Sequence, residues 1–218
     1  MTLTKEDKTR LREMEAWVNR HSQIMDDLHK ANPDLPFVTL AVMASDQQSA
    51  EKADELLAAG EPFDAVRHIV GSYSRLTWTV GKYSEGLISH AELLDEWPEL
   101  WRGSDPDDTD RRWLQIWREA YQRAGRTVLD EGVPLPPGRL TLFRGQMAGD
   151  PLGIAWSLDR GIAAKFANGA GFRTAVMGGI IIVARVRRDR VLGYLTGRGE
   201  SEVIVDPGDV RVMRTEAP

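Results

Sequence analysis

Two glutamates near the C-terminus are the first residues whose spacing suggests chemistry. Glu200 and Glu202 stand directly before the apolar run 203–205. Residues two apart in a strand point to the same face, so the two carboxylates are expected side by side. Like charges repel each other, and burial raises a carboxyl pKa, so such a pair is costly unless it is used, as in glycosidic bond cleavage. The alternative is a solvated strand rim with Arg198 paired to one of the glutamates.

An arginine followed by a glycine stands at the end of an expected strand, 139–145. The Arg144 guanidinium can hold a phosphate through two parallel hydrogen bonds. Gly145 has no side chain and therefore lets the backbone approach a ligand closely. The alternative is that Arg144 is an ordinary solvated charge, because arginine is mostly exposed in proteins.

A short strand at 153–158 is expected to lead into a helix at 160–167. Phe166 belongs to the inward stripe of that helix. This arrangement leaves Ser157 and the Trp156 ring at the end of the strand, where the ring is able to stack on a nicotinamide or another base.

In chain order these signals are an arginine at a strand end, a serine strand followed by an A-x-x-F-A helix, and the run E-x-E-V-I-V-x-P-G at 200–208. That order resembles the arginine–serine–glutamate class of mono-ADP-ribosyltransferases over about residues 139–214. The resemblance implies an α+β domain with a split antiparallel sheet, an N-glycosidic bond at a ribosyl C1′ as the reacting bond, and NAD as the substrate.

The resemblance also implies a role for each residue. Glu202 would bind the ribose 2′-hydroxyl and stabilise an oxocarbenium-like transition state, which gains energy from a fixed carboxylate as positive charge appears. Glu200 would orient or deprotonate the acceptor. The remaining implied positions are Ser157 in catalysis and, in the NAD site, Arg144, which would hold the phosphates, with Gly145, Trp156 and Phe166.

One motif departs from the family pattern. The usual Ser-Thr-Ser triplet appears as Ala155-Trp156-Ser157, so a substrate other than NAD stays open. The first hypothesis is NAD-dependent ADP-ribosyl transfer to a protein or nucleic acid, or NAD hydrolysis. The second is a DNA glycosylase that excises a modified base, for instance in defence against phage. The third is a non-catalytic module that binds a nucleotide or a protein.

The elements that must position these residues change in character near the proline-rich segment 133–138, because clustered prolines cannot continue a helix. We expect a helical region at 1–133 and an ADP-ribosyltransferase-like α+β domain at 134–218. In the helical region, Trp113, Trp117 and Tyr121 recur at helical spacing and predict a buried packing face. The expected strands after the 160–167 helix are 178–187, 191–195, 200–205 and 209–214.

The amino-acid composition limits the classes of binding partner that we expect. The 218 residues carry a formal net charge of −5, which argues against a bulk electrostatic grip on nucleic acid but leaves room for a local basic patch. No apolar run is long enough to predict a membrane span, and the polar start predicts no signal segment, so we expect a cytoplasmic protein. Cysteine is absent and the four histidines lack ligand spacing, so no metal site is expected.

Overall fold

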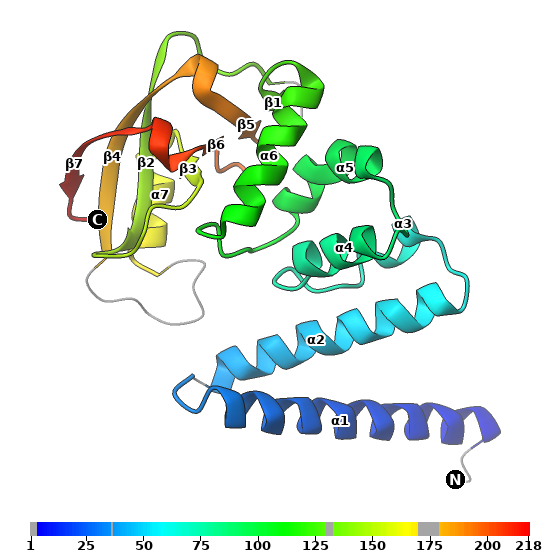
Figure 1. The fold of residues 1–218 in the computed structure, drawn as a ribbon. Helices are drawn as coiled ribbons and strands as arrows, with labels where there is room; N and C mark the ends of the chain where they lie inside the picture. Colours follow the sequence, from blue (N-terminus) through cyan, green and yellow to red (C-terminus); the bar gives the residue numbers. More distant parts are fainter. Residues whose placement is uncertain (1–3, 36, 130–132, 170–178) are drawn as a thin grey trace. The chain divides into compact units, whose positions relative to one another are not determined.

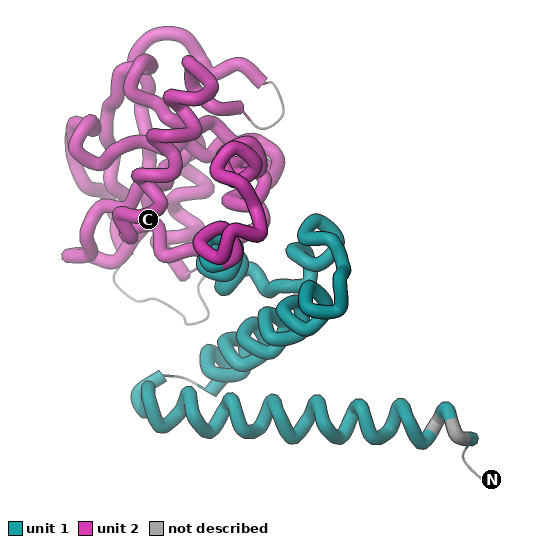
Figure 2. The backbone as a smooth tube through the Cα atoms, turned by 45° about the vertical axis from the view of Figure 1, so that its right-hand side comes forward, with its two compact units in different colours: residues 1–81 teal, residues 82–218 magenta. Residues whose placement is uncertain are grey.

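The computed structural model describes residues 4–35, 37–129, 133–169 and 179–218 (Figure 1). The chain forms two compact units, residues 1–81 and 82–218 (Figure 2). The change of sequence pattern near residue 133 therefore falls inside the second unit. The physical reason is that the helices α5 (His90–Arg102) and α6 (Arg111–Ala124) pack against the sheet that follows them.

The first unit is helical. It contains α1 (Lys5–Ala31), α2 (Phe37–Ala58) and α3 (Phe63–Val66), while α4 (Arg75–Ser84) runs across the boundary between the units. The apolar run 37–43, whose type the pattern leaves open, is the first part of α2. Helices α1 and α2 contact each other, and the Gln48 side chain donates a 2.9 Å hydrogen bond to the Trp17 carbonyl. A small core of Ala53, Val66, Val70 and Trp78 completes this unit.

Helices α5 and α6 have clear start signals. Ser89 and Glu92 form a capping box at the start of α5, and Asp110 caps α6, which ends at Gly125 in a left-handed conformation. The predicted packing face of α6 is confirmed at Trp113 and Trp117, which are 3% and 0% exposed. These helices contribute a layer of tryptophans to the second unit.

The second unit is built around a seven-stranded sheet in the order β1-β5-β6-β3-β2-β4-β7. The expected α+β class is confirmed, but the sheet is mixed rather than purely antiparallel, because β1 follows α6 and runs parallel to β5. The strands are β1 (Val128–Leu129), β2 (Arg139–Met147), β3 (Ala155–Ser157), β4 (Gly179–Arg187), β5 (Val191–Leu195), β6 (Glu202–Val205) and β7 (Arg211–Glu216), with short 3₁₀ turns at Arg188–Arg190 and Pro207–Asp209.

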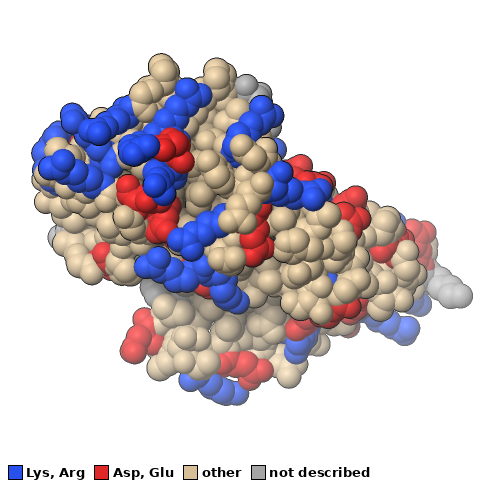
Figure 3. Space-filling view, turned by 45° about the horizontal axis from the view of Figure 1, so that its top comes forward, with Lys and Arg blue, Asp and Glu red and all other residues tan. Residues whose placement is uncertain are grey.

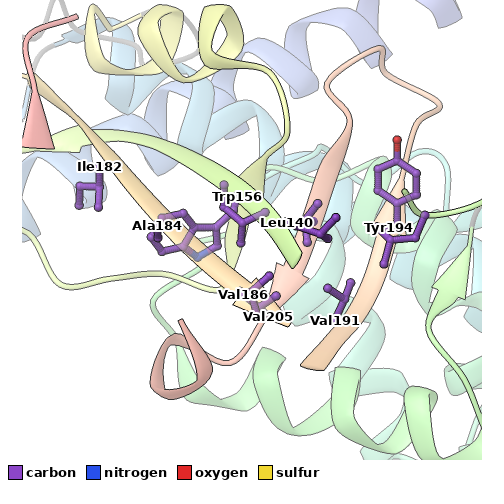
Figure 4. Packing of buried hydrophobic residues seen from close by; sticks show 11 residues of the cluster. Leu140, Trp156, Ile182, Ala184, Val186, Val191, Tyr194 and Val205 are labelled. Atoms are coloured by element: carbon purple, nitrogen blue, oxygen red, sulfur yellow. The ribbon is translucent and has the colours of Figure 1, made fainter. Parts of the chain in front are cut away.

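The two faces of the sheet pack differently. On one face, Trp156 lies in a hydrophobic cluster with Leu140, Ala184 and Val186 (Figure 4). On the other face, α7 (Arg160–Ala167) packs against β2 and β4. Among the described residues, no helix combines the length and apolarity needed to cross a membrane.

Candidate functional site

The central strands bring the predicted serine and glutamate together. Ser157 on β3 lies directly opposite Glu202 on β6, and also opposite Phe143 on β2. Residues directly opposite in an antiparallel ladder project from the same face of the sheet. Ser157 and Glu202 are therefore neighbours on the face that α5, α6 and α7 cover.

Glu202 is a partly buried carboxyl group that accepts a hydrogen bond from an indole. Its Oε1 accepts a 3.1 Å hydrogen bond from the indole Nε1–H of Trp101 on α5. Within the part of the chain that the structure describes, it makes no ion pair. The pKa of Glu202 is raised to about 7, chiefly by loss of hydration on burial; the carboxylates of Glu200 and Asp108 add to the rise, and the Trp101 hydrogen bond and Arg198 oppose it.

The Trp101 ring beside Glu202 belongs to a layer of tryptophans. The Trp101 ring lies 6.4 Å from that of Trp97 and 5.8 Å from that of Trp117, between centroids. Trp117 in turn packs on Gly193 of β5, where a Cβ atom would come within 2.6 Å of the ring. A glycine at this position therefore lets the tryptophan layer approach the strand beside β6.

The two glutamates do not share a strand. The expected strand 200–205 begins only at Glu202, because Ser201 has a φ of 45°, in the left-handed region that a non-glycine residue rarely adopts. The alternation of side chains is broken between the two carboxylates, so the expected side-by-side pair is corrected. Glu200 lies 3.8 Å from the guanidinium of Arg198, as the solvated-rim alternative predicts, whereas Glu202 makes no ion pair with any residue that the structure describes.

Ser157 holds the backbone of the loop before β6. Its Oγ donates a 2.6 Å hydrogen bond to the Glu200 carbonyl and accepts one of 2.9 Å from the Asp159 N–H. Leu158 N–H bonds to the carbonyl of Ser201 beside it. The hydroxyl proton of Ser157 is thus committed to the loop, and the residue positions Glu200 and Ser201.

Arg144 is already paired. Its Nη1 and Nη2 donate to the Asp108 carboxylate at 2.6 and 3.0 Å, its Nε to Gln146 at 2.7 Å and its Nη1 also to the Ala155 carbonyl at 2.7 Å. Four of the five guanidinium N–H donors are engaged. The expected phosphate contact therefore competes with Asp108, an internal carboxylate.

The Arg144–Asp108 pair fills a gap between two strands. β2 and β3 share a single registered pair, Phe143 with Ser157. Beyond it, the Ala155 N–H donates to Asp108 at 2.9 Å and the Ala155 carbonyl accepts from Arg144. Side chains thus replace the ladder hydrogen bonds that β2 would otherwise supply. Asp108 contacts Arg144 directly and also raises the pKa of Glu202, so its carboxylate connects the two predicted site residues.

Three of the residues expected around a nucleotide have structural contacts. A Cβ atom on Gly145 would lie 1.9 Å from the Ala163 carbonyl oxygen, so this glycine admits α7 rather than a ligand. Trp156 is 2% exposed, and its Nε1–H bonds to the Gly153 carbonyl, so its ring presents no open face for stacking. Phe166 is half-buried on α7.

Trp101 and Asp108 are the site residues that sequence reasoning missed. In the sequence, Trp101 looks like an ordinary buried aromatic residue. Asp108 looks like an ordinary acidic residue of the polar turn 104–108. A usable signal for Asp108 was Gly153, because a Cβ there would lie within 2.1 Å of the Asp108 carboxylate. The glycine indicates that another group approaches the backbone closely at residue 153, but the sequence does not show that this group is Asp108.

Comparisons with protein-family models, with curated proteins and with solved structures found no match to this chain. Among the described residues, no group of three or more histidine, aspartate or glutamate side chains is arranged to hold a metal ion. The groups around Glu202 therefore provide the chemistry from which we infer a function.

Proposed function

We propose that residues 82–218 form an enzyme that cleaves an N-glycosidic bond at a ribosyl C1′, with NAD as substrate in an ADP-ribosyl transfer or hydrolysis reaction. The observation that carries the proposal is Glu202, a partly buried carboxyl group with a pKa near 7, an indole donor and no cationic partner among the described residues. Strongly shifted carboxyl groups of this kind occur preferentially at functional sites.

The proposed cleavage depends on the Glu202 carboxylate, which pairs with no cation among the described residues. When the bond from C1′ to the base nitrogen breaks, the base leaves with the electron pair and positive charge develops on the sugar. An ionised Glu202 gains attraction only as that charge appears, so it stabilises the transition state more than the bound substrate. An acceptor hydroxyl, amine or water then forms the new bond to C1′ and loses its proton to Glu200, which passes it to solvent.

Two further features support this assignment. Ser201 holds a sparsely populated backbone conformation directly before Glu202, and such conformations concentrate at active sites. Ser157 and Arg198 fix the loop: the Arg198 side chain donates to the carbonyls of Arg102 and Ser104, at 3.2 and 3.4 Å. Arg144 follows Phe143 on β2 and therefore projects from the opposite face of the sheet to Ser157 and Glu202. We keep it as the phosphate ligand of the proposal because Asp108 contacts it directly and also acts on Glu202, with Asp108 displaced from one edge of the guanidinium when the phosphates bind.

Nicotinamide release tests the leading assignment. The purified chain is incubated with NAD, alone and with candidate acceptors, and the products are identified by mass. Wild-type protein is expected to release nicotinamide, and Glu202→Gln to lose at least about a hundredfold of that rate, as when one group that stabilises transition-state charge is removed. No release by the wild type under any of these conditions would count against the use of NAD.

Excision of a base from DNA is the second candidate. It uses the same carboxylate and the same bond type, and it is favoured by exposed arginines on β2, β4 and β7 of the same unit. The test is the formation of abasic sites, detected as alkali-labile breaks, in modified and unmodified DNA without NAD. Intact strands in every sample exclude this candidate, and a Glu202→Gln control separates excision from a contaminating nuclease.

A further inference from the structure

Arginines face one another across three neighbouring strands at one end of the sheet. Arg139 on β2 lies directly opposite Arg187 on β4, and Arg185 on β4 lies opposite Arg211 on β7. All four are exposed. Like charges directly opposite in a ladder destabilise it, so two such pairs in adjacent rows are a cost that the fold does not require.

Most of this positive charge has no internal partner. Arg187 pairs with Asp189 at 2.6 Å. Among the described residues, the guanidinium groups of Arg139, Arg185 and Arg211 make no ion pair and no hydrogen bond. Their charge is therefore available to an external anion.

The same arginines border a hollow. An open depression of about 780 Å³ lies beside the sheet end and is lined in part by Arg139 and Arg187. Its rim also carries Arg126 and Arg188, which are exposed and lack an acidic partner in the described ranges. The hollow extends the basic area away from the strands and offers room for a phosphate-bearing group.

The positive charge is concentrated in this part of the surface. The whole chain has 28 lysines and arginines against 33 aspartates and glutamates, so a positive patch reflects placement rather than composition. In Figure 3 the basic side chains, drawn blue, gather on the upper left part of the face shown. A local field of this sign steers an anionic partner even when the net charge is negative.

We propose that this arginine surface binds the phosphate backbone of a nucleic acid; it comprises Arg126, Arg139, Arg185, Arg187, Arg188 and Arg211. Every basic residue in the set is arginine, whose planar fork suits phosphate oxygens better than a lysine ammonium. Side chains two apart on a strand repeat at about 6.6 Å, which provides a row of charges for a polyanion rather than a cup for one ion.

The chemistry of the surface also sets the mode of binding. All six members are arginines, and the hollow beside them is also lined by Tyr121, so most of the contacts that the surface offers are to phosphates. Contacts made to phosphates alone position a strand without reading its sequence. Binding is therefore sequence-independent and strongly weakened by salt. Because these residues make no contact with Glu202, binding stands or falls separately from the proposed cleavage reaction.

Fluorescence anisotropy with labelled single-stranded DNA, duplex DNA and single-stranded RNA tests the proposal on the full chain. The triple variant R139Q/R185Q/R211Q is compared with R12Q/R111Q/K165Q, a control that removes the same charge from exposed positions elsewhere. Thermal unfolding verifies that the first variant folds, which we expect because its changes relieve repulsion between strands.

Wild type and the control variant are expected to bind at least one of these probes, with affinity falling by about the fourth power of salt concentration if four to five phosphates are contacted. The R139Q/R185Q/R211Q variant should lose at least about tenfold in affinity near 50 mM salt. Three results overturn the proposal: no binding by the wild type, equal losses in both triple variants, or tighter binding to phosphatidylserine vesicles than to every nucleic acid.

Discussion

The indole Nε1–H of Trp101 and the Oε1 of Glu202 are joined by a 3.1 Å hydrogen bond between residues 101 positions apart in the chain. The bond connects the last turn of α5 to the first residue of β6. It gives a desolvated carboxyl group one donor but no positive charge. The donor favours the ionised form, while burial disfavours it, and burial has the larger effect.

Glu202→Gln is expected to stabilise the fold at alkaline pH. The folded pKa of about 7 lies above the unfolded value of 4.5, so the folded state holds its proton more tightly. Wild-type stability therefore falls as pH rises from about 4.5 to about 7, and then levels. The amide keeps an oxygen for Trp101 and carries no charge, so above pH 7 the gain is up to about 3 kcal/mol.

Urea unfolding at a series of pH values measures this gain. The exposed Glu99 on α5 provides a control, and Glu99→Gln should change the free energy of unfolding by less than about 0.5 kcal/mol. Parallel curves for wild type and Glu202→Gln across the whole pH range are incompatible with a raised pKa at this position.

Trp101→Phe should raise the pKa of Glu202 further, because the ring remains while the hydrogen bond that favours the ionised form is lost. If the ionised carboxylate is the active form, the rise of kcat/KM with pH moves to higher pH. Trp97→Phe is the matched control, since the Trp97 indole N–H is buried in the same layer without a partner among the described residues. Identical pH profiles for wild type and Trp101→Phe would rule out this role for the indole.

Asp108→Ala should destabilise the protein by about 3 kcal/mol or more, because it leaves the largely buried Arg144 guanidinium without its counter-charge. Asp108→Asn should cost less, since the amide oxygen still accepts from Ala155 N–H. Urea unfolding measures both variants against Asp150→Ala, a change at an exposed aspartate near the same loop. If Asp108→Ala lowers the free energy of unfolding no more than the control does, the Arg144–Asp108 pair does not hold β2 and β3 together.

Gly145→Ala tests whether this glycine serves packing. A Cβ there meets backbone atoms of Ala163 and Ala167, which cannot swing away as a side chain can. We expect a loss of roughly 3 kcal/mol, the upper part of the usual range for overpacking. Gly81→Ala on α4 has open space and should gain about 0.5–1 kcal/mol from helix propensity. If Gly145→Ala is as stable as the wild type, the glycine is not needed for packing, and the expected role in the close approach of a ligand is favoured.

Ser201→Gly should raise the free energy of unfolding by about 1 kcal/mol, because glycine tolerates the left-handed conformation that serine holds with strain. Thermal denaturation measures the gain. Reduced turnover in the more stable variant would show that the strain serves activity, as stabilising changes at functional sites often cost function. A lower unfolding temperature is the result that this explanation does not allow.

Individual helices and strands could be predicted from the sequence because the residues that specify them lie within or next to each element. The cap at Asp159 and the apolar stripe after it predict α7, and the β-branched run 180–183 predicts β4. The strand expected at 200–205 was too long by two residues, since nothing in the letters Gly-Glu-Ser reveals a positive φ at Ser201. Backbone strain of this kind is imposed by neighbouring segments, here by the hydrogen bonds of Ser157 and Leu158 to the loop.

The sequence alone determined which groups are present: an arginine before a glycine, a serine after a tryptophan, and two glutamates before an apolar strand. Only the tertiary structure decided their state. It paired Arg144 with Asp108, turned Trp156 into the core, began β6 at Glu202 so that Glu200 lies outside the strand, and joined Glu202 to the indole of Trp101. The reason is that pairing and desolvation depend on which distant segment covers a group, and a local pattern carries no information about that partner.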